Sequence, residues 1–235
     1  MAYLLRRSIF IHTPKTAGQW VAAALDNAGL LTGNLGPIHA SPDEIEQEAG
    51  FRSDLFQFTF VRHPLSWYRS MWAHRVDEEW EPIDALDWFT PRWIAHWATF
   101  TDSCQAADFH DYIYKCAQTF PNGFVSALFD DYTKGCHFVG KQEHLISDLC
   151  AALVQAGEEF EKTKLLSTKP RNVRGQKPSR QRDGLYTKEL IELVLKLESR
   201  AIDRFGYQED PMRYLSPMVD QIAEQKKTQF SLNKD

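Results

Sequence analysis

Residues 14–18 of the chain read Pro-Lys-Thr-Ala-Gly, a combination that suits the binding of a phosphate-like anion. They follow an apolar run of β type at 8–12 and precede a segment with helical spacing, so they join a predicted strand to a predicted helix N-terminus. Such a junction offers backbone N–H groups and a partial positive charge to an anion. Lys15 adds a mobile charge, Thr16 adds a hydroxyl donor, and Gly18 lets the backbone approach a ligand closely.

The order of residues in this loop excludes the Walker A pattern GxxxxGK[ST], because the lysine precedes the glycine. By itself the loop predicts only an anion at a helix N-terminus. An ordinary helix cap with a solvated lysine is the alternative. A second phosphate site at a neighbouring strand end would favour the binding interpretation.

A second group of candidate residues follows the apolar run 55–61, which is predicted to be a buried strand. Arg62 stands at the end of this run and can grip a phosphate through forked, charge-assisted hydrogen bonds. Pro64 is expected to open the next helix. Ser70 follows Arg62 by eight positions, about two turns into that helix, on a face that can look back at the loop. His63 is interpreted as structural.

The elements expected around these loops alternate between strand and helix. Strands are predicted at 8–12, 55–61 and 136–140, with a short one at 164–167. Helices are predicted in the segment that ends at Gly29, in the one that Ser41 caps and that ends near Gly50, at 143–157 with Val154 inward, and at 186–205. This alternation predicts an α/β fold in which a parallel sheet is flanked by helices and ligands bind beyond the carboxyl ends of the strands.

A chain of 235 residues suits one domain, which we place at 1–210 with a polar tail at 211–235. The region 66–135 is predicted to be mostly helical and is rich in aromatic residues. Six of the seven tryptophans fall between 67 and 97, where they are interpreted as core. A pocket for an acceptor, stacking on sugar rings or enclosing phenols and lipids, is the alternative.

The composition restricts the class of protein. A net charge of −5 argues against general nucleic-acid binding, which needs a basic footprint. The four cysteines have no CxxC spacing and are expected to be reduced and mostly buried. No apolar run approaches the roughly 18 residues of a membrane span, so we expect a cytoplasmic protein. The oligomeric state is open.

The two loops together resemble the donor-binding motifs of sulfotransferases that use 3′-phosphoadenosine 5′-phosphosulfate (PAPS), in particular the carbohydrate-type and bacterial enzymes with a PKTAG loop. The resemblance is good over 8–75 and loose over 136–207. It implies a P-loop-like sulfotransferase fold with a helical, aromatic-rich insertion. It assigns donor binding to Pro14, Lys15, Thr16, Ala17, Gly18, Gln19, Trp20, Arg62 and Ser70. Gln19 stands where the family usually has threonine, and His63 stands where it usually has Asp or Asn.

Some sulfotransferases of this kind carry a catalytic histidine between the two motifs, and His39 lies there, 23 residues before Arg62. His39 is therefore the candidate base that removes the proton of the acceptor, with Glu44 and Glu46 as alternatives. Lys15 would neutralise charge on the leaving phosphate. No metal is required. A loop histidine that packs on the following helix is the other interpretation of His39.

A basic segment runs from residue 162 to 182 with eight Lys or Arg and no acidic residue. Arg174 and Lys177 are candidates for contacts to the 3′-phosphate and adenine, although the segment could instead bind an anionic acceptor or be a solvated loop. The acceptor, a carbohydrate, a lipid or a small alcohol, is open. A phosphate-loop kinase or nucleotide hydrolase, and a non-catalytic nucleotide-binding protein, are the alternative functions.

Overall fold

The computed structural model describes residues 2–37, 39–80, 99–100, 102–169 and 186–207. The chain clusters into two compact units, and each is described by itself. Of the described residues, the first unit holds those up to 62 and those of 132–169, and the second holds the remainder. One domain at 1–210 stays a prediction, and the predicted tail at 211–235 lies outside the described residues.

The first unit contains a five-stranded mixed sheet with the strand order β3-β1-β2-β4-β5. The strands are β1 (Ala2–Leu4), β2 (Ser8–Ile11), β3 (Gly33–Leu35), β4 (Phe56–Val61) and β5 (Phe138–Lys141). β2, β4 and β5 are mutually parallel, whereas β1 is antiparallel to both β2 and β3. The α/β class is confirmed.

The prediction of a wholly parallel sheet is wrong because of β1. Only residues 5–7 separate β1 from β2, and the Leu5 backbone N–H donates to the Ser8 carbonyl at 2.9 Å. So short a link can join antiparallel strands, while a parallel neighbour needs a crossover of a dozen or more residues. The three strands that carry the predicted loops are parallel nonetheless.

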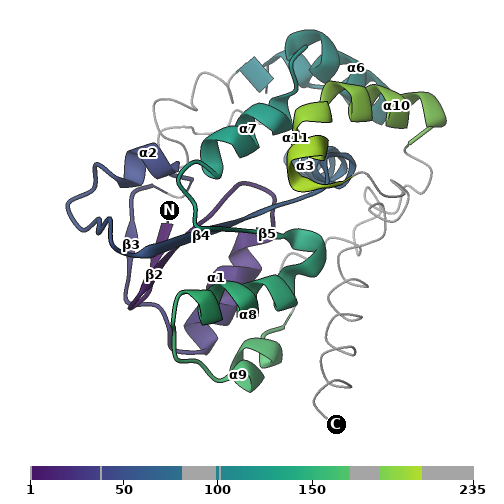
Figure 1. Ribbon diagram of the computed structural model, residues 1–235. Helices are drawn as coiled ribbons and strands as arrows, with labels where there is room; N and C mark the ends of the chain where they lie inside the picture. The colour runs from purple at the N-terminus through teal and green to yellow at the C-terminus, as the bar shows by residue number, and fades with distance from the viewer. Residues whose placement is uncertain (1, 38, 81–98, 101, 170–185, 208–235) are drawn as a thin grey trace. The chain divides into compact units, whose positions relative to one another are not determined.

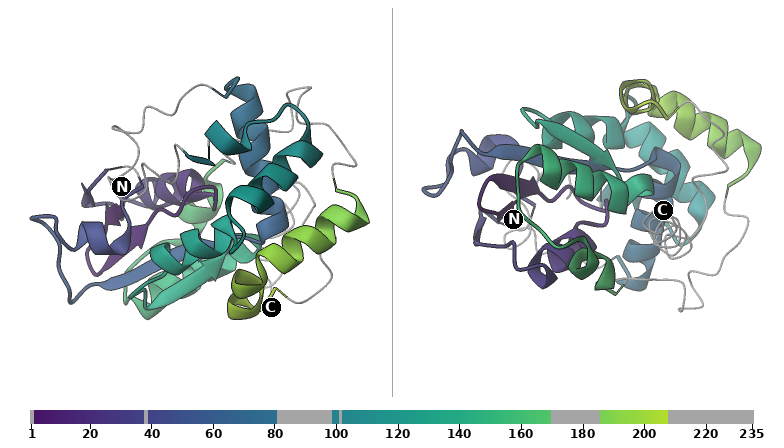
Figure 2. Two further views of the ribbon diagram at one scale, coloured as in Figure 1. Left: turned by 90° about the horizontal axis from the view of Figure 1, so that it is seen from above. Right: turned by 60° about the horizontal axis from the view of Figure 1, so that its bottom comes forward.

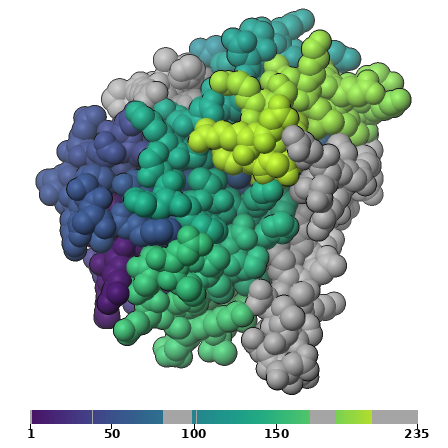
Figure 3. All heavy atoms as spheres, in the orientation of Figure 1, coloured from purple at the N-terminus to yellow at the C-terminus, as the bar shows by residue number. Residues whose placement is uncertain are grey.

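Three helices pack on one face of this sheet: α1 (Gly18–Asn27), α8 (Leu145–Gln155) and α9 (Lys162–Ser167) (Figure 1). Their apolar faces join Phe10, Phe58 and Phe60 of the sheet in a single buried cluster. α1 and α9 lie side by side (Figure 2), and the Asn27 amide donates to the Lys164 carbonyl at 2.7 Å. α8 and α9 also form a continuous green part of the surface of this unit (Figure 3).

Two expectations for these helices are corrected. The segment 164–167 belongs to helix α9 rather than to a strand, because a short apolar run has no periodicity that separates the two and Leu165 and Leu166 reach the core from a helix. Val154 is 67% exposed, because it lies on the outer side of α8 rather than toward the sheet.

The predicted capping box is confirmed at α2 (Pro42–Ile45). The Ser41 backbone N–H donates to Glu44 Oε2 at 2.7 Å, and Pro42 is the first helical residue. The helix ends at Ile45 rather than near Gly50, so it is one turn long. A 3₁₀ turn, η1 (Gln142–His144), precedes α8.

The second unit is helical in its described part. Its helices include α3 (Pro64–Asp77), α6 (Phe109–Thr119), α7 (Phe124–Tyr132, whose last residue clusters with the first unit), α10 (Lys188–Leu197) and α11 (Ser199–Phe205). Trp67, Trp72 and Trp80 are buried, as the core interpretation predicts, whereas the other tryptophans of 67–97 lie outside the described residues. The single helix predicted at 186–205 is divided at Glu198, which leaves the helical conformation.

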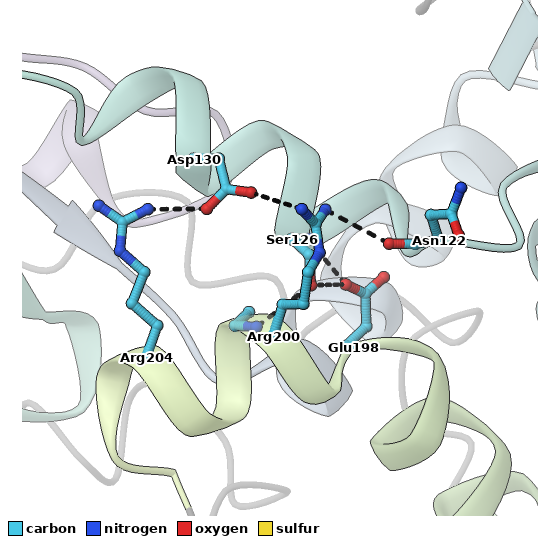
Figure 4. A network of polar contacts seen from close by, with 7 residues as sticks. Asn122, Ser126, Asp130, Glu198, Arg200 and Arg204 are labelled. Carbon is cyan, nitrogen blue, oxygen red and sulfur yellow. Dashed lines mark hydrogen bonds and ion pairs between the residues drawn. The ribbon is translucent and has the colours of Figure 1, made fainter.

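Glu198 is completely buried and joins three helices of this unit through its carboxylate. One oxygen accepts from the Tyr68 hydroxyl at 2.6 Å and from the Val125 N–H at 3.1 Å. The other accepts from the N–H and the hydroxyl of Ser126, both at 2.7 Å (Figure 4). Every lone-pair direction of the carboxylate thus has a donor, which satisfies a group that is otherwise costly to bury. Burial raises the pKa of Glu198 above its usual range.

We expect Glu198→Gln to lower the free energy of unfolding by about 1–3 kcal/mol, because an amide N–H₂ would face donors where an oxygen now accepts. Asp130→Asn is the matched control. Asp130 lies in the same region (Figure 4), but its ion pairs with Arg200 and Arg204 are exposed and contribute at most about 1 kcal/mol. Urea unfolding of both variants measures the difference, and equal losses would contradict the role of the buried carboxylate.

Candidate functional site

The loop between β2 and α1 has a backbone shape that suits an anion. Lys15 and Ala17 have φ angles of 65° and 69°, in the left-handed region that residues other than glycine seldom adopt. Left-handed residues in such a turn gather successive N–H groups into a concave nest. Ala17 is the N-cap of α1 and has no side chain that could accept from the first turn. The helix N-terminus is therefore free of the side-chain cap that would compete with a ligand.

A chain of hydroxyl groups fixes this loop to the sheet. Thr59 Oγ1 donates to the Ile11 carbonyl at 2.8 Å. Because its proton is used there, Thr59 Oγ1 accepts from Thr13 Oγ1 at 2.7 Å. Thr16 Oγ1 donates to the Thr13 carbonyl at 2.8 Å and is completely buried. The Thr16 hydroxyl, predicted to donate to a ligand, thus braces the loop, and a contact to the donor molecule stays a prediction.

Arg62 contacts the same loop from the end of the neighbouring parallel strand β4. Its Nη1 donates to the Lys15 carbonyl at 3.1 Å, and the residue is only 7% exposed. A guanidinium has five N–H donors, so one group can hold the loop and also bind an anion. The structure therefore brings together Lys15 of the first predicted phosphate motif and Arg62 of the second.

His39 lies beside the start of the β2–α1 loop, in contact with His12. Its ring lies edge-to-face with that of His12, with centroids 4.7 Å apart. Its Nδ1 is 3.2 Å from the His12 carbonyl, which can only accept, so Nδ1 carries the proton and Nε2 carries the lone pair. The Tyr132 hydroxyl donates to the His39 carbonyl and holds the backbone.

The electrostatics keep His39 uncharged. Burial, with a contribution from the Lys15 cation, lowers the pKa of His39 to about 3. The side chain is therefore a neutral imidazole with Nε2 as its basic atom. A bound anion would raise this pKa, because a negative charge stabilises the imidazolium. Such a group can accept a proton from an acceptor molecule.

His12 is the site residue that sequence reasoning did not single out. A Cβ atom on Gly18 would lie within 3.0 Å of Cδ2, Nε2 and Cγ of His12, so the imidazole occupies the space that a side chain at Gly18 would need. Gly18 was expected to admit a ligand, and the structure shows that it admits this ring. The spacing of Phe10 and His12, two residues apart in the predicted strand 8–12, was the available signal, and in the structure their rings stack with centroids 6.2 Å apart.

The remaining predicted residues are placed as follows. Trp20 belongs to the buried cluster, and its backbone N–H donates to the carbonyl of the N-cap residue Ala17 at 2.9 Å. Gln19 is exposed in the first turn of α1, and Pro14 is buried. Ser70 lies on α3 of the second unit, so a contact with the loop stays a prediction. Arg174 and Lys177 lie outside the described residues.

His63 has the structural role that the sequence indicated. It is the N-cap of α3, and its Nδ1 accepts from the Leu65 backbone N–H at 3.2 Å. The departure from the Asp or Asn of the resembled motif is thereby explained, because an imidazole nitrogen supplies the same capping acceptor.

The chain matched no protein-family model, no curated protein and no solved structure in the comparisons made. Among the residues that the structure describes, no three His, Cys, Asp or Glu side chains gather as a metal site would need. None of the described helices is long and apolar enough to cross a bilayer. None of the four cysteines, all of which lie among the described residues, forms a disulfide; Cys104 and Cys116 are buried, and Cys136 and Cys150 are partly buried.

Proposed function

We propose that this protein is a PAPS-dependent sulfotransferase with a P-loop-like sulfotransferase fold, acting in the cytoplasm. The observation that carries the proposal is the hydrogen bond between Arg62 and the Lys15 carbonyl. It connects an anion-binding loop with an arginine at the next parallel strand end, and two phosphate sites side by side suit a nucleotide that is phosphorylated at two positions. His39, neutral and next to the loop, supplies a base.

The proposed reaction is an in-line transfer. The acceptor hydroxyl, or amine, gives its proton to His39 Nε2 as its oxygen or nitrogen forms a bond to sulfur. The bond between sulfur and the bridging phosphate oxygen breaks, and its electron pair goes to that oxygen. Lys15 neutralises the charge that develops there. Backbone N–H groups at the start of α1 hold the 5′-phosphate.

The acceptor is a carbohydrate, a lipid or a small alcohol in this proposal. A kinase or nucleotide hydrolase fits less well, because those enzymes need a Walker lysine and an acidic magnesium ligand at a strand end, where this chain has Arg62. A non-catalytic binding protein would have no use for a base held in one tautomer.

Thermal unfolding with ligands tests the donor assignment. We expect 3′-phosphoadenosine 5′-phosphate (PAP) at about 100 times its Kd to raise Tm by about 5–10 °C, which corresponds to about 2.7 kcal/mol of linkage. Lys15→Ala should remove most of this shift. Lys134→Ala, which only breaks an exposed ion pair with Asp43, should leave it unchanged.

Two results would overturn the proposal. One is stabilisation by ATP with magnesium and none by PAP, which indicates a kinase or hydrolase. The other is PAP binding without transfer of label from radiolabelled PAPS to any member of a library of sugars, lipids and alcohols, which indicates a binding protein.

A further inference from the structure

The imidazole of His12 has no hydrogen-bond partner among the residues that the structure describes. The residue is 5% exposed, and neither of its ring nitrogens hydrogen-bonds to a described residue. A buried polar side chain in that state is costly unless something else completes it. A ligand bound at the β2–α1 loop would supply such a partner.

The position of the ring shows which nitrogen meets the ligand. The Cδ2–Nε2 edge lies against Gly18, the first residue of α1, at the positive end of the helix, where no side chain of the N-cap residue accepts from the first turn. Nδ1 is on the opposite edge and is completely buried. Nε2 is therefore the nitrogen beside the anion nest.

The position of the proton follows from the same geometry. A buried N–H without an acceptor is rarer in proteins than a buried acceptor without a donor. The favoured neutral tautomer of His12 therefore has its proton on Nε2, and Nδ1 is unprotonated. Burial lowers the pKa of His12 well below its usual range, so the ring carries one proton.

We propose that His12 is an anion-binding residue, whose Nε2–H donates to a phosphoryl or sulfuryl oxygen held at the N-terminus of α1. This inference rests on the proposed function for the identity of the nucleotide, but the contact requires only the anion. The two adjacent imidazoles then have opposite tautomers. His12 donates to the bound anion through Nε2, and His39 accepts a proton at Nε2.

Three variants separate donation from packing. The amide nitrogen of Gln falls near the position of Nε2 of histidine, and that of Asn near Nδ1, while Leu fills similar space without a donor. We expect PAP to bind His12→Gln within about 3-fold of the wild type, and His12→Asn and His12→Leu about 10- to 100-fold more weakly. Calorimetry of the folded variants measures this. Wild-type affinity in His12→Leu, or equal losses in Leu and Gln, would overturn the proposal.

Nuclear magnetic resonance of the wild-type protein, with ¹⁵N-labelled histidine, decides the question even where a variant fails to fold. We expect His12 as the Nε2–H tautomer, with a shift of that proton on addition of PAP. A Nδ1–H tautomer would overturn the proposal.

Inorganic pyrophosphate is the second probe in both experiments, and it separates this inference from the proposed function. If pyrophosphate binds and depends on His12 but PAP does not bind, the sulfotransferase proposal fails and the role of His12 stands. If PAP binds equally to the wild type and to His12→Leu, only the role of His12 fails. If neither anion binds the wild type, both fail.

Discussion

Gly18→Ala is expected to weaken PAP binding at least about 100-fold and to destabilise the fold. The added Cβ would lie within 3.0 Å of three atoms of the His12 ring, which is buried, so the ring or the backbone must shift. Overpacking of this kind costs about 1–3 kcal/mol. Displacement of the ring or of the first turn of α1 would also break the anion nest, and the loss of two charge-assisted hydrogen bonds accounts for the lost affinity.

Gly33→Ala is the matched control, because Gly33 lies in strand β3 with a negative-φ backbone and its nearest neighbour to an added Cβ is 3.9 Å away. It should bind PAP normally. The double variant His12→Ala/Gly18→Ala should recover stability relative to Gly18→Ala, because it removes the clash, without recovering affinity. If the double variant loses as much stability as the two single variants His12→Ala and Gly18→Ala together, the two residues do not compete for the same space.

The strand-to-helix junctions could be predicted from the sequence, because their signals are local. Pro64 at a first helical position and the Ser41–Glu44 capping box depend on neighbouring residues only, and both occur as predicted. The run 55–61 becomes β4 with one residue's difference at its start. Since Lys15 and Arg62 follow two such runs, their meeting at one edge of the sheet could be expected from parallel pairing alone.

The features that were missed depend on contacts between distant residues. The direction of β1 follows from its three-residue link to β2 and from its pairing with β3, from which residues 5–32 separate it, and no periodicity within Ala2–Leu4 encodes it. α9 is a helix because it packs beside α1. The role of His12 depends on the absence of a side chain at Gly18, and the sequence shows that glycine without showing which ring fills the space.

His39→Ala is expected to lower kcat by about 10²- to 10⁴-fold, the usual contribution of a general base, while PAP affinity changes by less than about 3-fold. The separation follows from geometry, because the His12 carbonyl fixes the proton of the His39 ring on Nδ1, so Nε2 is its basic atom. His144→Gln, at an exposed histidine of η1, is the control and should behave as the wild type. Transfer of label from PAPS to the best acceptor measures kcat.

The pH dependence gives the same assignment an independent test. Because burial lowers the pKa of His39 to about 3, the ligand-free protein keeps this proposed base uncharged far below the ordinary histidine value of about 6.5. We therefore expect kcat/KM to persist at pH 5, with no acid limb near 6.5 while the protein stays folded.

The free energy of unfolding, in contrast, is expected to decrease over this pH range. The unfolded chain takes up the proton first, so the His39 contribution to folding is lost as pH falls from about 6.5 toward 3, and His39→Gln should flatten this loss. An acid limb near 6.5 that disappears in His39→Gln would show that the imidazole is not held neutral, and an unchanged kcat in His39→Ala would remove it from the reaction.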